Sequence, residues 1–331
     1  MRNTLSALCD NFIENRDIIK ATFGWESTYL YPVCAALFTD NQLKSDANKM
    51  KYCKDLLKRQ VGLFSNFKGT GKLVMITMLA IDREPEQKLK NALEVYSALK
   101  KYFFTSQYLP LVSMIITNLA KPEHYVAIAE RTRHIYELMK KDHPFLTSAE
   151  DSVFAALLAI SDLTDEQIVK ETKRCYDFLK PEFFSGNAVQ SLSHVLTLCD
   201  GTAEDKCRRA LTLFNDLKKK GYRYGTNYEL ATLGVLAMIP ADRAAVINDI
   251  IEVDNFLSAQ KGYRLFGINR KQRLMHAGML VTSDYIDQSN NLTTSSAVSA
   301  AMSLIAAQQA AMCAVIASSS VAASSASSGG N

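Results

Sequence analysis

A pattern that recurs about every 40 residues constrains the fold of this 331-residue chain more than any other feature. In each copy, a helix-like segment ends near an apolar residue, an aromatic or Gly-containing turn follows, and a more apolar segment comes next. The apolar residue stands at seven positions: Ile19, Leu57, Leu99, Met139, Leu179, Leu217 and Leu257. The spacings are 38, 42, 40, 40, 38 and 40 residues. Such a period is typical of chains built from repeated helical units.

Each copy predicts two helices that form a hairpin. In the copy that starts near residue 91, Leu93, Tyr96, Leu99 and Lys100 form one stripe at helical spacing on an otherwise polar segment. Its partner, LPLVSMIITNLA, is apolar nearly all round, which predicts a helix buried on several sides. Charged or Pro-containing links such as DREPEQK separate the copies and supply helix caps.

We therefore predict an all-α fold of about seven helical hairpins of roughly 40 residues. Because no hairpin can bury its own apolar face, the hairpins should stack as an α-solenoid, with a closed α/α toroid as the alternative. The predicted domains are a helical-repeat domain over residues 1–285, an Ala-rich capping helix over 286–316, and a flexible Ser/Ala/Gly tail over 317–331. No charged side chain occurs from Gln288 to the end of the sequence.

The letters GTGK at residues 69–72 resemble part of a phosphate-binding loop. That loop requires G-x-x-x-x-G-K-[ST] between a buried strand and a helix. Here Asn66 stands at the first glycine position, Leu73 follows Lys72, and the upstream segment has helical spacing. The stretch is therefore predicted to connect two helices, and Gly69 and Gly71 supply backbone conformations that other residues disfavour.

Composition and charge alone do not indicate which ligand the protein binds. The formal net charge of +4 is mild, so nucleic-acid binding is unlikely, and weak binding of single strands is kept only as a third hypothesis. Asp10, Glu14 and Asp17 precede any long apolar run, which predicts a cytoplasmic protein without a secretory signal. The seven cysteines include no C-x-x-C pair. We predict no metal, no cofactor and no membrane span.

The turns within the hairpins hold the best candidate binding residues, because a stack places equivalent turns along one edge. Aromatic and basic residues alternate there, and such a row can bind a peptide or stack on bases. The candidate edge consists of Trp25, Phe64, Phe104, His143, Phe145, Phe184, Tyr222, Arg223, Tyr224, Tyr263 and Arg264. The structural alternative is that the aromatic rings fold inward and the lysines lie at helix C-termini, where the helix dipole favours cations.

A candidate polar site follows if the hairpins close into a toroid. It would contain Glu150, Asp151, His194 and His276. The structural alternative for Glu150 is a capping box with Thr147, and for the two histidines a hydrogen-bonded place in the core. No two histidines stand at i and i+4, and no H-E-x-x-H motif occurs.

Several segments together resemble a known family: FGWESTYLY, GLFSNFKGTGKLVMITMLA, HPFLTSAEDSVFAALLA and AAQQAAM. The family is bacterial, mostly from Bacillota, and is called domain of unknown function 4003. The resemblance covers roughly residues 5 to 320 and implies a bacterial cytoplasmic protein. It implies no activity, substrate or catalytic residue, because the family has none established.

The sequence favours a non-catalytic scaffold over an enzyme. The leading hypothesis is a helical-repeat protein that binds a protein or peptide along its concave face or its aromatic and basic edge. The alternative is an α/α-toroid enzyme or a binding protein for a small apolar ligand, which rests on analogy of fold. The oligomeric state is open.

Overall fold

A computed structural model of the protein describes residues 1–62, 65–263, 268–289 and 315–316. These residues form fourteen α-helices and contain no β-strand, so the prediction of an all-α fold is confirmed. Two compact units share the chain: unit 1 contains residues 1–10 and 164–315, and unit 2 contains residues 11–163 and 316–331. The choice between an open stack and a closed toroid stays a prediction.

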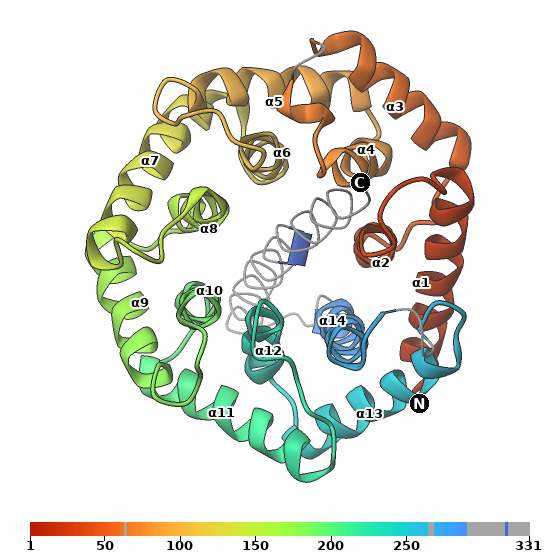
Figure 1. Ribbon diagram of the computed structural model, residues 1–331, viewed down its shortest axis with the longest axis vertical. Helices are drawn as coiled ribbons and strands as arrows, with labels where there is room; N and C mark the ends of the chain where they lie inside the picture. The colour runs from red at the N-terminus through yellow and green to blue at the C-terminus, as the bar shows by residue number, and fades with distance from the viewer. Residues whose placement is uncertain (63–64, 264–267, 290–314, 317–331) are drawn as a thin grey trace, which may run out of the picture. The chain divides into compact units, whose positions relative to one another are not determined.

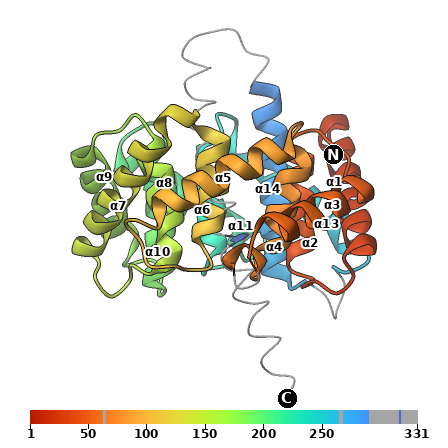
Figure 2. The same ribbon diagram turned by 90° about the horizontal axis from the view of Figure 1, so that it is seen from above.

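Unit 2 consists of helical hairpins, each with a longer first helix and a shorter second helix. The first helices are α1 (Asn3–Thr22), of which the residues from Asn11 onward belong to this unit, α3 (Ala47–Gln60), α5 (Pro85–Leu99) and α7 (Tyr125–Asp142). The second helices are α2 (Leu30–Asp40), α4 (Lys72–Ile81), α6 (Leu109–Leu119) and α8 (Ser152–Ile160). The second helices pack in the order α2, α4, α6, α8, and Figure 1 views α4, α6 and α8 end-on. Figure 2 shows the same hairpins from the side.

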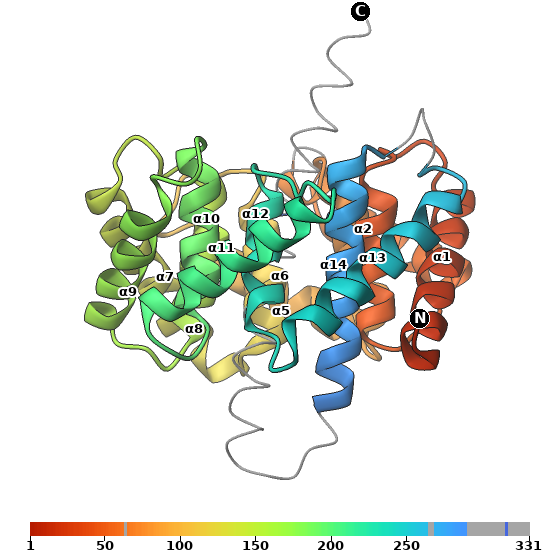
Figure 3. The ribbon, with the colours of Figure 1, turned by 90° about the horizontal axis from the view of Figure 1, so that it is seen from below.

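Unit 1 repeats this arrangement. Its first helices are α9 (Asp165–Leu179), α11 (Ala203–Lys219) and α13 (Arg243–Ala259), and its second helices are α10 (Gly186–Thr197), α12 (Glu229–Met238) and α14 (Arg270–Ser289). Helix α12 packs between α10 and α14, as Figure 3 shows. The first ten residues of the chain belong to this unit, because Arg2 forms ion pairs with Asp249 of α13 at 2.8 Å and Asp284 of α14 at 2.7 Å.

The core lies between the two rows of helices in each unit. All seven recurring apolar residues of the sequence are buried near the C-terminal ends of first helices: Ile19, Leu57, Leu99, Met139, Leu179, Leu217 and Leu257. The second helices are buried on nearly every side, and every residue from Ser152 to Ala159 of α8 is buried. Because a buried Leu or Ile side chain contributes roughly 1.5–3 kcal/mol, these stripes decide which faces meet.

Cations on the first helices bind the last carbonyl groups of the second helices. The Lys49 ammonium donates to the carbonyl oxygen of Asp82 after α4, at 2.6 Å. The Arg131 guanidinium donates to the carbonyl oxygens of Ala159 and Ser161 at the end of α8. Arg209 donates in the same way to Ile239, which follows α12. Since the final carbonyls of a helix have no partner within the helix, each contact fixes one hairpin end.

Candidate functional site

Three aromatic side chains in unit 2 are almost completely exposed to solvent. Trp25 lies between α1 and α2, Phe104 between α5 and α6, and Phe145 between α7 and α8. Their exposed fractions are 102%, 96% and 99%. We call these three residues the aromatic edge. Single exposed apolar residues are ordinary, but three large rings in equivalent turns of one unit indicate a contact surface.

Two of these turns hold one inward ring and one outward ring. Phe23 is buried while Trp25 is exposed. Phe103 contacts the ring of Tyr136 edge-on, with centroids 5.4 Å apart, while its neighbour Phe104 is exposed. The expected inward packing of aromatic residues therefore holds for Phe23 and Phe103 and not for Trp25 and Phe104.

The turns of unit 1 differ from one another. Phe184 is fully exposed, whereas the adjacent Phe183 is buried against Phe214 with centroids 5.2 Å apart. Tyr224 and Tyr263 are both buried, so they add no exposed surface.

Hydrogen bonds explain the burial of these two tyrosines. The Tyr224 hydroxyl bonds with the Thr232 hydroxyl at 2.7 Å, and burial raises the pKa of that phenol. The Tyr263 hydroxyl lies 3.0 Å from Nδ1 of His276. A buried phenol requires such a partner, which the sequence pattern did not reveal.

The remaining candidates of the predicted edge have mixed surroundings. Tyr222 is half-buried, and the Arg270 guanidinium lies 5.6 Å from its ring centre. Arg223 is exposed. His143 is half-buried, with its Nε2 atom 3.3 Å from a carboxylate oxygen of Asp142. Phe64 and Arg264 lie outside the described residues.

Exposed cations lie in or next to the turns of unit 2. They stand at the ends of first helices or at the start of the turns: Lys20, Lys58, Arg59, Lys100, Lys101, Lys140 and Lys141. Lys72, by contrast, forms an ion pair with Glu26 at 2.9 Å. Lys72 ends the GTGK stretch and begins α4, and a short 3-10 turn over Asn66–Lys68 precedes the stretch between α3 and α4. The prediction of a helix-to-helix connection at this place is confirmed.

Glu150 and Asp151 lie in a short 3-10 turn, Ala149–Asp151, that leads into α8. The Asp151 carboxylate accepts a hydrogen bond from the Ser148 N–H at 2.8 Å, and the two residues form a capping box. The capping box expected for Thr147 and Glu150 is thus wrong by one residue. Burial raises the pKa of Asp151 to about 7, and burial also raises the pKa of Glu150. The capping box with Ser148 accounts for the buried position of Asp151.

The two candidate histidines belong to unit 1. His194 is buried on α10, and His276 is buried on α14 beside Tyr263. Helix α12 packs on both of these helices. Within the described residues, no group of three or more His, Cys, Asp or Glu side chains could hold a metal ion. The cysteines that the structure describes are buried, and burial raises the pKa of Cys34 and of Cys199 to about 12, which disfavours a thiolate nucleophile.

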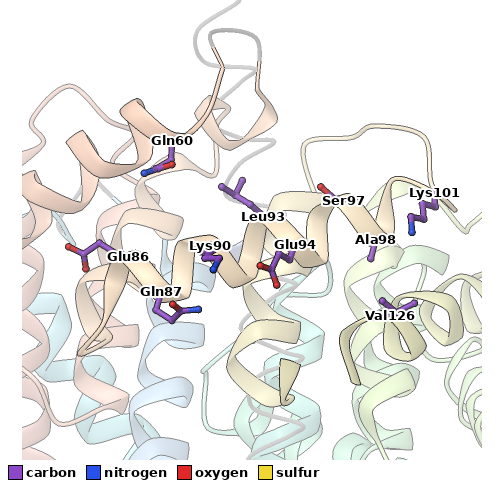
Figure 4. Close-up of a pocket in the computed structure, with 10 residues that line it drawn as sticks. All are labelled: Gln60, Glu86, Gln87, Lys90, Leu93, Glu94, Ser97, Ala98, Lys101 and Val126. Carbon is purple, nitrogen blue, oxygen red and sulfur yellow. The ribbon is translucent and has the colours of Figure 1, made fainter. Parts of the chain in front are cut away.

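A depression of about 690 Å³ lies over the first helices of unit 2. Its lining comes from the end of α3, the length of α5 and the start of α7, including Gln60, Lys90, Glu94 and Val126. Figure 4 shows most of the lining side chains along α5, with Gln60 on α3 and Val126 on α7, and the side chains do not converge on one point. No helix that the structure describes has both the length and the hydropathy needed to cross a bilayer.

Comparison with known proteins gives a family and one distant relative. The chain is 22% identical to the Bacillus subtilis protein named "Uncharacterized protein YeaA" over 187 residues, which cover 54% of this chain and 56% of the relative. The match thus spans little more than half of that relative. No solved structure matches the chain. The sequence matches the family described as "Protein of unknown function (DUF4003)" over residues 15–310, so the chain belongs to the DUF4003 family.

Proposed function

We propose that this chain is a non-catalytic helical-repeat scaffold of the cytoplasm that binds a protein or peptide partner. The aromatic edge of unit 2 is the proposed contact surface. The observation that carries the proposal is the exposure of Trp25, Phe104 and Phe145, each between 96% and 102%. Aromatic anchors of this kind dominate the energetics of protein interfaces.

The size of the rings supports this assignment. A large aromatic side chain offers roughly 150–250 Å² of surface. At about 25 cal/mol per Å², full burial of one ring would contribute about 4–6 kcal/mol before the costs of association. Three rings therefore provide enough apolar surface for a specific complex. The lysines of the same turns would orient the partner and raise the rate of association.

The polar candidates give less support to an enzyme. Asp151 forms a capping box with Ser148, and His276 is paired with Tyr263 inside unit 1. Each of these groups has a structural partner that explains its burial. A catalytic site would instead require titratable groups that converge on one cavity.

The proposal can be tested by photo-cross-linking in the cytoplasm of the native host. A photoreactive amino acid is placed at Phe104 or at Phe145, and the matched control carries it at Glu94, which is exposed on α5 of the same unit. We expect discrete cross-linked proteins from the two turn positions and not from the control. Equal labelling at all three positions, or none at any, would contradict the proposed function.

A further inference from the structure

Unit 2 carries opposite charges on its two ends. We define the turn side as the last four residues of each first helix together with the described residues of the following turn: 19–29, 57–62, 65–71, 96–108 and 139–151. The link side is defined in the same way for the second helices: residues 37–46, 78–84, 116–124 and 157–163. The turn side has eight Lys or Arg against four Asp or Glu, whereas the link side has three against six. In a helical hairpin these two sides lie at opposite ends.

The environment of the side chains increases the excess of cations on the turn side. There Glu26 is paired with Lys72 and Asp151 is buried in a capping box, while most of the cations are exposed. On the link side, four carboxylates are exposed, Asp46, Glu84, Glu123 and Asp162, and so are three cations, Lys44, Arg83 and Lys121. Lys44 is paired with Glu14 of α1. The solvent therefore meets a basic surface on the turn side and a mixed surface with a small excess of carboxylates on the link side.

Both sides also expose apolar groups. The aromatic edge belongs to the turn side. On the link side, Leu43, in the link before α3, is 39% exposed. Each side can therefore bury apolar surface when it meets the other, in addition to pairing charges.

The spacing between successive turns matches the spacing between successive links. Every hairpin contributes one turn to one side and one link to the other, so successive turns and successive links are separated by the same packing of neighbouring hairpins. We propose that the partner of the aromatic edge is a second copy of this chain, whose link side docks on the turn side of unit 2. This inference rests on the proposed function, because it names the protein that the edge binds.

The proposed contact joins two different surfaces and can therefore repeat. Each copy would offer a free turn side and a free link side, so assembly continues head to tail and grows with concentration. Salt weakens it, because ions screen exposed charges beyond ~10 Å at 0.1 M. Since Trp25 is the only tryptophan of the sequence, its fluorescence reports directly on the aromatic edge.

A charge-reversal experiment with the full chain tests the proposal. The turn variant carries Lys101→Glu, Lys140→Glu and Lys141→Glu, and the link variant carries Glu84→Lys, Glu123→Lys and Asp162→Lys. Sedimentation velocity is measured from about 1 to about 100 µM at low salt, together with the emission of Trp25. We expect the unchanged chain to increase in average mass with concentration, and its Trp25 emission to shift to shorter wavelength.

The two variants are expected to behave differently alone and together. Each reversal makes the two sides of one copy alike in charge, so either variant alone should associate at least about tenfold more weakly. Mixing the variants restores opposite charges across every contact and should restore assembly. The matched control, Lys90→Glu with Glu94→Lys on the exposed face of α5, leaves both sides intact and should assemble like the unchanged chain. Replacing Phe104 and Phe145 with Ser should weaken assembly while Trp25 still reports.

Several outcomes overturn the inference, and they are distinguishable from failure of the proposed function. A chain that stays monomeric at all concentrations, or variants that fail to complement each other, refute the second copy as partner. If that monomer still gives cross-links from Phe104 to another protein, the proposed function stands. If the monomer instead shows a Trp25 shift with vesicles of phosphatidylglycerol and phosphatidylcholine, and gives no cross-links, the edge binds a membrane surface and both proposals fail.

Discussion

Replacement of Arg131 should destabilise the protein more than replacement of any nearby exposed cation. Arg131 extends from α7 toward the end of α8. One of its terminal nitrogens donates to the carbonyl oxygens of Ala159 and Ser161 at 2.8 and 3.0 Å, and the other donates to that of Leu163 at 2.5 Å. These carbonyls belong to the last turn of α8 and to the link that follows it, where no further helical N–H is available.

The magnitude follows from these three hydrogen bonds. A hydrogen bond contributes about 0.5–1.5 kcal/mol net, and more when one partner is charged. Arg131 is only half-buried, so water can replace part of what is lost. We therefore expect Arg131→Met to lower the free energy of unfolding by about 2–4 kcal/mol. Arg131→Lys, which keeps the charge but not the planar fork, should have an intermediate effect.

Chemical denaturation with guanidinium chloride, followed by circular dichroism, measures the effect. The matched control is Arg133→Met, because Arg133 lies on the same helix and pairs with Glu137 one turn along. A largely solvated ion pair contributes less than about 1 kcal/mol. Arg133 is half-buried and its guanidinium lies 5.3 Å from the ring centre of Phe103, a contact that adds about 0.5–1 kcal/mol. Equal midpoints for the two Met variants would refute the reasoning that the carbonyl contacts hold α8 in place.

Two further predictions concern single buried positions. Because burial raises the pKa of Asp151 to about 7 from its ordinary 3.8, its stabilising contribution is complete below about pH 4 and lost as the pH rises through 7. The unfolding free energy should fall by about 2–3 kcal/mol between pH 5 and pH 8, and Asp151→Asn should lack this part of the slope. Gly278→Ala should destabilise by about 1–2 kcal/mol, because the new methyl group would lie 2.6 Å from Leu236 and 3.0 Å from the fixed Tyr224 hydroxyl. Gly71→Ala, with no atom within 4 Å of the added methyl group, is its neutral control in thermal unfolding.

The sequence predicted the helical core well because the core depends on periodicity. An apolar stripe such as Leu93, Tyr96 and Leu99 needs only a helix and a neighbour to become buried. Leu99 and the other recurring apolar residues are indeed buried at the ends of first helices. Segments that are apolar all round, such as α6 and α8, lie between other helices. These features depend on local spacing, which can be read from a single sequence.

The turns were less predictable because their side-chain directions are set by residues outside the turn. Phe183 and Phe184 are chemically identical neighbours, and nothing in the sequence tells which one is buried. Phe183 is the buried ring because Phe214 of the next hairpin contacts it. Tyr224 is buried where the Thr232 hydroxyl, in the helix that follows the turn, forms a hydrogen bond with it. A turn motif alone could identify neither partner.

The exposed rings are also the residues that the fold does not need. Phe23 and Phe103 already close the ends of their hairpins, so Trp25 and Phe104 add no packing within the chain. A ring that is about 100% exposed keeps its whole apolar surface in contact with water, which is unfavourable. A serine at the same position would expose much less apolar surface. Stability therefore gives no reason for a large aromatic residue at these turns. A contact that forms only when something else covers the edge gives that reason, because the same surface then becomes the source of affinity.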